Sequence, residues 1–254
     1  MRNFSFVEEM NSLSENDSAS LSILNWNGVG LGNRGAAFLF GTALQSNTST
    51  VVLFAKYNDI RKLPNEFHWG RLQFCYLSDN PLGDDGAALI AHALVNPSGG
   101  CYLHTLHLSH CNIQDVSPLA ITVQHRSCPA SLRHLDLSGN PLSSKGLIQL
   151  ADALQHNTSL ERLSFRYVSS CANSGETDRS EVRRAFLRML QHHNMTLQYL
   201  DGLEEDDAEI AYWLALNRNG RRYWDTMTPG RGADPTVWCA FLRHRPDLGG
   251  STPA

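Results

Sequence analysis

The chain has 254 residues, 42% of them hydrophobic, and a formal net charge of −4, values that fit a folded domain and exclude gross disorder. The mildly acidic balance argues against nucleic acid as a partner, because proteins that bind phosphate backbones carry a basic excess on one face. No stretch approaches the roughly 20 apolar residues that cross a bilayer, and Glu8 and Glu9 lie where a signal peptide needs apolar residues. We therefore expect a cytoplasmic protein without a membrane partner, and its six scattered cysteines favour free thiols over disulfides.

A repeated leucine frame follows residues 1–20, which we expect to form an N-terminal segment that leads into the repeats and is partly disordered. The frame is L-x-x-L-x-L-x-x-N/C-x-L, and its clearest copies are LQFCYLSDNPL, LHTLHLSHCNI and LRHLDLSGNPL. Copies begin at residues 21, 50, 72, 103, 132, 160 and 197. Each predicts a short strand whose leucines face inward and whose alternate residues face outward, followed by a turn and a helix. A repeat solenoid is therefore expected over residues 21–203.

Polar residues at fixed places in the frame are expected to hold the turns. A buried asparagine at the ninth position can satisfy backbone groups of the neighbouring turn, and Asn58, Asn80 and Asn140 occupy it. Cys111 takes the same place, and we interpret it as a structural thiol rather than a reactive one. The N-x-S/T triplets that begin at residues 47, 157 and 194 are interpreted as punctuation between repeats rather than as glycosylation sites.

Helices are predicted after the first, third and fifth strands, in GNRGAAFLFGTALQSNTS, GDDGAALIAHALVNPS and SSKGLIQLADALQHNTS. Small residues on them should let each helix lie close to the sheet, namely Ala91, Ala93, Ala151 and Ala153. Three copies depart from this pattern. The second lacks a recognisable helix in RKLPNEFHWGR, the fourth has a proline-interrupted one in DVSPLAITVQHRS, and the sixth is stretched by SSCANSGETDRS.

The segment after the repeats is expected to form a helical C-terminal cap over residues 204–246, because a solenoid otherwise ends in an exposed slice of core. EEDDAEIAYWLALNRNGRRYW begins with acidic residues and ends with arginines, as suits a helix dipole. TVWCAFLRHRP predicts a second small helix, and residues 247–254 a flexible tail.

With this frame the chain resembles the ribonuclease-inhibitor-like class of leucine-rich-repeat proteins, over roughly residues 21–200. The class includes Ran GTPase-activating proteins and the repeat domains of intracellular immune receptors. The resemblance implies an α/β fold, a leucine-rich-repeat solenoid with a curved parallel sheet and outer helices. It says little about function, because inhibitors, GTPase activators and sensors share this architecture.

Outward strand residues should line the concave face of such a solenoid, where binding usually occurs. The third frame position contains Ile23, Val52, Phe74, Thr105, His134, Arg162 and Tyr199, and the fifth contains Asn25, Phe54, Tyr76, His107, Asp136, Ser164 and Asp201. Aromatic residues and arginine often anchor protein interfaces. The alternative is that exposed strands simply favour aromatic and β-branched residues. We select as partner-binding candidates Phe54, Phe74, Tyr76, His107, Arg133, His134, Asp136, Arg162 and Arg166.

Catalytic and metal-binding interpretations are weaker. His107, Asp136 and Ser164 are the residue types of a hydrolase triad, but a triad needs the histidine between the other two, and here Asp136 is in the middle. The histidines at 104, 107, 110 and 134 lack the spacing of a zinc site. We therefore expect no catalytic residues, no metal and no cofactor.

The sequence thus predicts a non-catalytic protein-protein interaction module, a scaffold, inhibitor or sensor that binds a protein partner on the concave face. The alternative that the resemblance suggests is a GTPase-activating protein of the Ran GTPase-activator type. The sequence leaves the partner's identity and the oligomeric state open.

Overall fold

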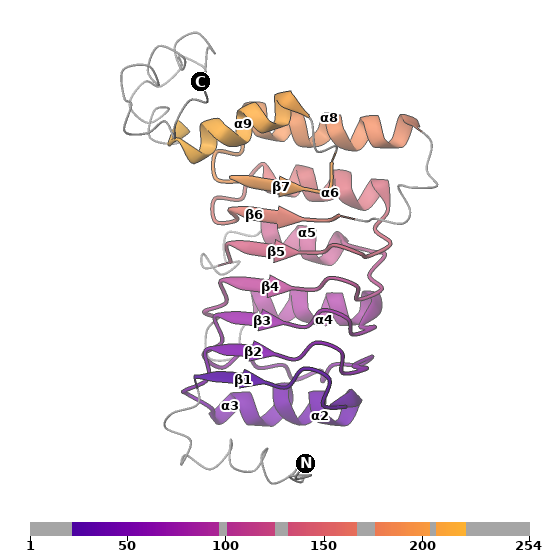
Figure 1. Cartoon of the computed structure of the whole chain (residues 1–254), viewed down its shortest axis with the longest axis vertical. Coiled ribbons are helices and arrows are strands. Elements are labelled where there is room, and N and C mark those ends of the chain that lie inside the picture. The colour runs from indigo at the N-terminus through magenta and orange to yellow at the C-terminus, as the bar shows by residue number, and fades with distance from the viewer. Residues whose placement is uncertain (1–21, 97–100, 125–131, 167–175, 204–206, 222–254) are drawn as a thin grey trace, which may run out of the picture.

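Seven short strands form one parallel sheet in the computed structural model, which describes residues 22–96, 101–124, 132–166, 176–203 and 207–221 (Figure 1). The strands lie side by side in chain order. Their bounds are β1 Ile23–Asn25, β2 Val52–Phe54, β3 Phe74–Tyr76, β4 Thr105–His107, β5 His134–Asp136, β6 Arg162–Ser164 and β7 Tyr199–Asp201. Equivalent frame positions pair in every neighbouring couple, so the frame read from the sequence is the register of the sheet.

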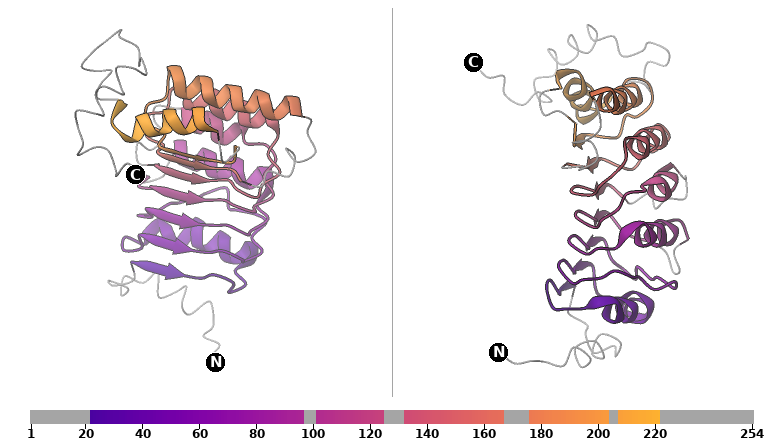
Figure 2. Two further views of the ribbon diagram at one scale, coloured as in Figure 1. Left: turned by 45° about the horizontal axis from the view of Figure 1, so that its top comes forward. Right: turned by 90° about the vertical axis from the view of Figure 1, so that its right-hand side faces the viewer.

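The helices of the described residues lie on one side of the sheet, as Figure 2 shows. The helical elements are α2 Gly32–Phe38, the π-helical turn η1 Leu39–Ala43, α3 Leu44–Ser46, α4 Gly83–Val95, α5 Ser117–Gln124, α6 Ser144–Leu154, α8 Glu176–His192 and α9 Ala208–Arg218. The leucine-rich-repeat solenoid predicted from the sequence is confirmed. None of the helices in the described part of the chain has the length and apolar character needed to span a membrane.

The inward leucines of the frame form one continuous core. Leu106, Leu108, Leu135 and Leu137 are at most 2% exposed and belong to a single cluster of buried residues. The alanines predicted to let the helices approach the sheet are also buried. At Gly146, which begins the apolar run of α6, an added Cβ would lie only 2.9 Å from Cγ1 of Val116 in the preceding repeat. The glycine is therefore required by the distance between repeats.

The asparagines at the ninth frame position join each repeat to the one before it, as predicted. The Asn140 side chain accepts hydrogen bonds from the backbone N–H groups of Cys111 (2.9 Å) and Ile113 (3.0 Å). It donates to the carbonyl oxygens of Leu108 (2.7 Å) and Leu137 (2.8 Å). Asn80 makes the equivalent bonds two repeats earlier. Each of these two asparagines thus satisfies at least four backbone groups away from water.

Cys111 breaks this series in an informative way. It is fully buried, and its thiol donates to the carbonyl oxygens of Leu77 (3.4 Å) and Ser109 (3.5 Å). A cysteine has no counterpart of the amide oxygen, and the Leu82 N–H donates to the Asn80 carbonyl instead (2.7 Å). Burial raises the pKa of the Cys111 thiol to about 12, which agrees with a structural rather than a reactive role.

A second series of asparagines lies where helices give way to strands. The Asn194 side chain accepts from the N–H groups of Thr196 and Leu197 and donates to the Leu154 and Asn157 carbonyls. Asn47 and Asn157 accept from their own following residues in the same way. The N-x-S/T triplets are therefore punctuation between repeats, because all three asparagine side chains are buried in these turns.

For the irregular repeats, the structure confirms one prediction and contradicts another. Residues 61–71 contain no helix, and Phe67 fills the space by stacking on Phe40 of η1 at 4.5 Å and packing edge-on against Trp69. The prediction that proline interrupts the fourth helix is wrong. Pro118 is the second residue of an unbroken α5, where its missing N–H leaves no helical hydrogen bond unmade.

The stretched part of the sixth repeat lies partly outside the described residues, but its last five residues begin the long helix α8. α9 packs against α8, and the N-cap residue Asp207 accepts from the Ile210 N–H (3.2 Å) and from Arg183 of α8 (2.9 Å). A helix therefore does form in the first part of the predicted cap. The second predicted helix and the tail lie outside the described residues, as does the N-terminal segment.

Candidate protein-binding surface

The outward strand residues at the third and fifth frame positions form two unbroken rows. We call these rows, together with the flanking side chains of Lys56, Arg133, Glu161 and Arg166, the sheet face. Each row crosses all seven strands, because the frame positions pair directly. Seven of the nine predicted binding residues lie in these rows, on β2 to β6: Phe54, Phe74, Tyr76, His107, His134, Asp136 and Arg162. Arg133 immediately precedes β5 and Arg166 follows β6 by two residues. The structure thus brings the candidate set onto neighbouring strands of one face.

An aromatic ladder runs along the fifth row. The ring of Phe54 stacks on Tyr76 with centroids 4.7 Å apart, and Tyr76 lies 4.7 Å from the ring of His107. The ammonium group of Lys56 also contacts this ladder, 5.4 Å from the Tyr76 centroid. All four side chains are only partly buried. Their order is set by contacts within the row, so the ladder is preorganised for contact with a partner.

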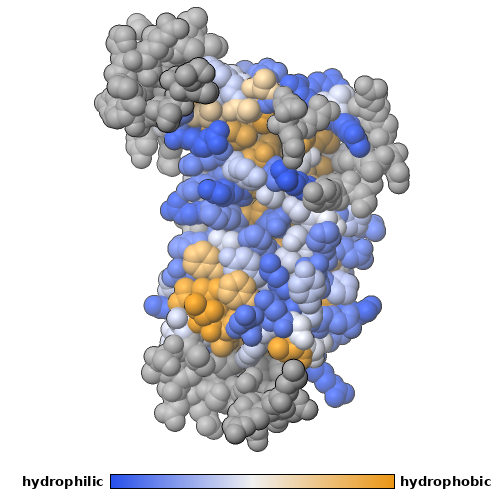
Figure 3. All heavy atoms as spheres, in the orientation of Figure 1, coloured by the Kyte–Doolittle hydropathy of each residue, from blue (hydrophilic) through white to orange (hydrophobic). Residues whose placement is uncertain are grey.

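Apolar residues continue the ladder toward β1. Ile23 is 55% exposed and pairs in register with Val52, which pairs with Phe74. Figure 3 shows hydrophobic residues gathered over this part of the face, beside a predominantly hydrophilic surface over the middle strands. Clustered apolar side chains at the surface of a folded protein often mark an interaction site.

Charged residues dominate the other half of the face. His107 Nδ1 lies 3.2 Å from Oδ2 of Asp136, its neighbour in the fifth row. Arg133 is paired with Glu161 and Arg166 with Asp201. Arg162 differs, because it lies against the ring of Tyr199, 5.8 Å away, and no carboxylate among the described residues pairs with it.

Two ionisable groups of the face have shifted pKa values. Burial alone would raise the pKa of Asp136, but hydrogen bonds from His107 and Ser138 outweigh it and hold the pKa below 3.8. The pKa of His134 is lowered by burial and by the nearby charge of Arg162. Both shifts favour an ionised carboxylate and a neutral imidazole near neutral pH.

The register also decides the triad question. His107, Asp136 and Ser164 follow one another across β4, β5 and β6, so the carboxylate separates the histidine from the hydroxyl and the triad order is wrong for proton transfer.

Thr105 departs from the expected exposure of its row. It is only 3% exposed, and its hydroxyl lies 3.4 Å from His134 Nδ1. In the sequence, the small size of Thr105 between Phe74 and His134 in the row was the feature that could have indicated its burial.

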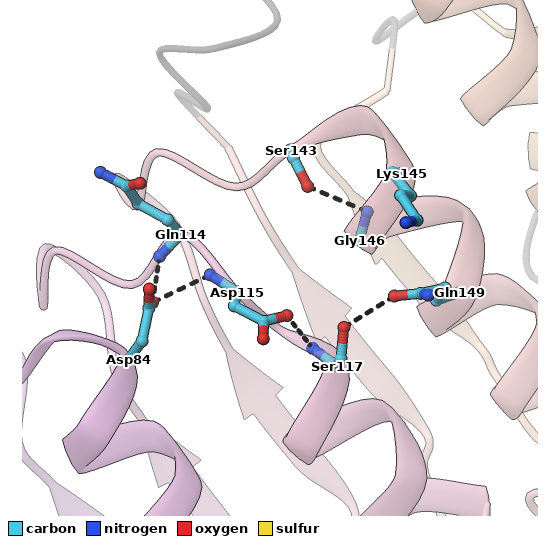
Figure 4. Close-up of a pocket in the computed structure, with 8 residues that line it drawn as sticks. All are labelled: Asp84, Gln114, Asp115, Ser117, Ser143, Lys145, Gly146 and Gln149. Carbon is cyan, nitrogen blue, oxygen red and sulfur yellow. Dashed lines mark hydrogen bonds between the residues drawn. The ribbon is translucent and has the colours of Figure 1, made fainter.

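A hollow of about 420 Å³ lies elsewhere, where three loops enter the helices of successive repeats (Figure 4). Several of its polar groups are already engaged: the Asp84 carboxylate accepts from the N–H groups of Gln114 (2.7 Å) and Asp115 (2.9 Å), and the Ser117 hydroxyl donates to Gln149 (2.7 Å). These bonds tie one repeat to the next. The hollow is therefore explained by repeat packing.

Comparison with known proteins agrees with the repeat frame. A family model described as "Leucine Rich repeat" matches residues 76–91, 101–117 and 129–151, which include β4, β5 and most of α4 and α6. The mouse (Mus musculus) ribonuclease inhibitor is 33% identical over 108 residues, 42% of this chain and 23% of that protein. The repeats of this chain are leucine-rich repeats similar to those of ribonuclease inhibitor.

Other relatives of this leucine-rich-repeat protein are named for further domains. The mouse "NACHT, LRR and PYD domains-containing protein 5" is 33% identical over 113 residues, 41% of this chain and 9% of that protein. The tropomodulin C-terminal domain of Caenorhabditis elegans aligns with 89% of this chain and 100% of that chain, at 13% identity and a TM-score of 0.40. The matched region spans less than a quarter of the length of the ribonuclease inhibitor and about a tenth of that of the NACHT-domain relative.

Proposed function

We propose that this leucine-rich-repeat protein is a non-catalytic protein-interaction module that binds a protein partner on the sheet face. The observation that carries the proposal is the ladder of Phe54, Tyr76 and His107, whose rings are 4.7 Å apart in each step and are partly exposed. Aromatic side chains fixed by their neighbours offer a large contact area with little further loss of rotamer entropy.

The geometry of the rest of the face supports binding over catalysis. The carboxylates of this half of the face are paired with neighbouring histidine or arginine side chains, and the register separates the hydroxyl from the histidine. Arginine and aromatic residues surround these pairs, which is the composition of interface centres. The family likeness adds support, because repeat solenoids commonly present extended binding surfaces.

The test starts from affinity capture with the full chain and identification of captured proteins by mass spectrometry. The candidate partner is then purified and titrated against the wild-type chain and the triple variant Tyr76→Ala, His107→Ala, Arg162→Ala. We expect the dissociation constant to rise at least about 100-fold, since three interface-centre residues that each contribute about 1 kcal/mol together contribute about 3 kcal/mol.

The matched control carries Lys145→Ala, Gln149→Ala and Arg188→Ala, three exposed residues of α6 and α8. It should bind like the wild type, and both variants should keep the wild-type circular dichroism spectrum. A triple sheet-face variant that folds and binds as tightly as the wild type would overturn the proposal. GTP hydrolysis by purified small GTPases should be unchanged by the chain; an acceleration would favour the GTPase-activator alternative.

A further inference from the structure

We propose that the partner surface is acidic and carries an apolar anchor, so that carboxylates meet Lys56 and Arg162 while the anchor covers the apolar residues of β1 to β3. The inference rests on the proposed use of the sheet face and adds the chemistry of what binds there. Two observations carry it: the division of the face into an apolar and a charged half, and the state of its cations.

The carboxylates of the described sheet face are already engaged. Asp136 accepts from His107, Glu161 from Arg133 and Asp201 from Arg166. Each is only partly exposed. A basic partner would therefore have to displace an existing intramolecular contact to reach any of these oxygens, which costs the free energy of that contact.

Two cations of the face, in contrast, contact aromatic rings and not carboxylates. Lys56 lies 5.4 Å from the centroid of Tyr76, and Arg162 lies 5.8 Å from that of Tyr199. No described carboxylate forms an ion pair with either of them. Contact with an aromatic ring leaves the donor hydrogens of a lysine or arginine free to meet an acceptor. The face thus presents unneutralised positive charge, although the chain as a whole carries −4.

The apolar half gives the position of the anchor. Ile23 is 55% exposed and continues in register through Val52 to Phe74, beside the stacked rings of Phe54 and Tyr76. β3 and β6 are three strand spacings apart, or about 15 Å. An apolar side chain over β3 and a carboxylate at Arg162 must then be separated by about 10 residues of a partner helix or about five residues of an extended segment.

Charge complementarity of this kind steers association and fixes the orientation of a partner. The composition of the face also favours a protein segment over nucleic acid. Two cations without a carboxylate partner among the described residues, beside an exposed aliphatic patch, offer few contacts to a phosphate backbone. The predicted partner is therefore a protein segment with aspartate or glutamate on either side of an aliphatic or aromatic anchor.

The probe is a phage-displayed library of random 16-residue peptides, selected in parallel on three folded forms of the full chain. These are the wild type, Arg162→Glu, and the charge-matched control Arg188→Glu, which changes an exposed arginine of α8. Binders are then tested as synthetic peptides against Phe54→Ser, Phe74→Ser and Lys56→Ala, with folding checked by circular dichroism.

We expect the wild type and Arg188→Glu to select peptides with an apolar anchor and Asp or Glu about five or 10 residues away, whereas Arg162→Glu selects Lys or Arg at that place. Wild-type peptides should bind Arg162→Glu at least 10-fold more weakly. Peptides that depend on Phe54 or Phe74 but show no acidic enrichment, or that single-stranded RNA displaces, would overturn the inference and leave the proposed function standing. Peptides that bind all face variants equally, or no enrichment at all, would contradict both.

Discussion

Replacing Asn140 by alanine tests how the repeats are held together. The Asn140 side chain accepts hydrogen bonds from two buried backbone N–H groups and donates to the carbonyl oxygens of Leu108 and Leu137, with a longer contact to a third carbonyl. Alanine leaves the N–H groups of Cys111 and Ile113 without acceptors, and both residues are fully buried. A buried donor without a partner costs about 1–3 kcal/mol, so the two together should lower the free energy of unfolding by about 4 kcal/mol.

Urea unfolding followed by far-ultraviolet circular dichroism measures this loss as a lower midpoint at an unchanged m-value. Amide hydrogen exchange should also accelerate at Cys111 and Ile113 more than at the amides of α4, because the change strands those two donors first. Asn65→Ala, at an exposed position, is the matched control and should change the free energy of unfolding by less than about 0.5 kcal/mol. A loss below about 1 kcal/mol at Asn140 would refute the view that the asparagine series is a main connection between repeats.

Three further changes follow from particular contacts. Cys111→Asn should raise the free energy of unfolding by about 1 kcal/mol, because an amide oxygen there can accept the N–H of Leu82 as the other asparagines do for their neighbours; a lower urea midpoint would contradict this. Gly202→Ala should cost more than about 2 kcal/mol, since Gly202 has φ +136° and its Cβ would overlap the Phe165 ring; thermal unfolding at an unchanged midpoint would argue against it. The lowered pKa of Asp136 contributes stability that is present above pH 3.8 and lost as the pH falls through the folded-state pKa, so Asp136→Asn should flatten the urea midpoint against pH below 5, and a parallel curve would disprove the coupling.

The sequence predicted the sheet well because the frame encodes it directly. Leucines at alternate positions define which side of each strand is buried, and the asparagine at the ninth position defines where the chain turns. Once those two features repeat, they fix which residues of neighbouring strands pair. The residues in each row of the sheet face then follow from the spacing of the frame.

Side-chain pairing across the face was less predictable. His107 with Asp136 could be anticipated because they occupy one row on neighbouring strands. The burial of Thr105 depends on the size of the flanking side chains, and the contact of Lys56 with Tyr76 depends on rotamers. Neither is encoded in the spacing of the residues.

The prediction of a helix was wrong where a single residue type has two possible roles. Proline disrupts the interior of a helix but is favoured in its first turn, and only the structure shows that α5 begins at Ser117, one residue before Pro118. The missing second helix was evident from composition, but the packing of Phe67 against Phe40 and Trp69 that replaces it was not.

Site-specific photocrosslinking tests the use of the sheet face most directly. Benzoylphenylalanine is introduced at Tyr76 in one form of the chain and at Ile121 in another, a residue of α5 that is 65% exposed. After irradiation with the identified partner, the chain should crosslink through position 76 and not through position 121. Crosslinking through position 121 alone, with an unlabelled sheet face, would contradict binding on that face.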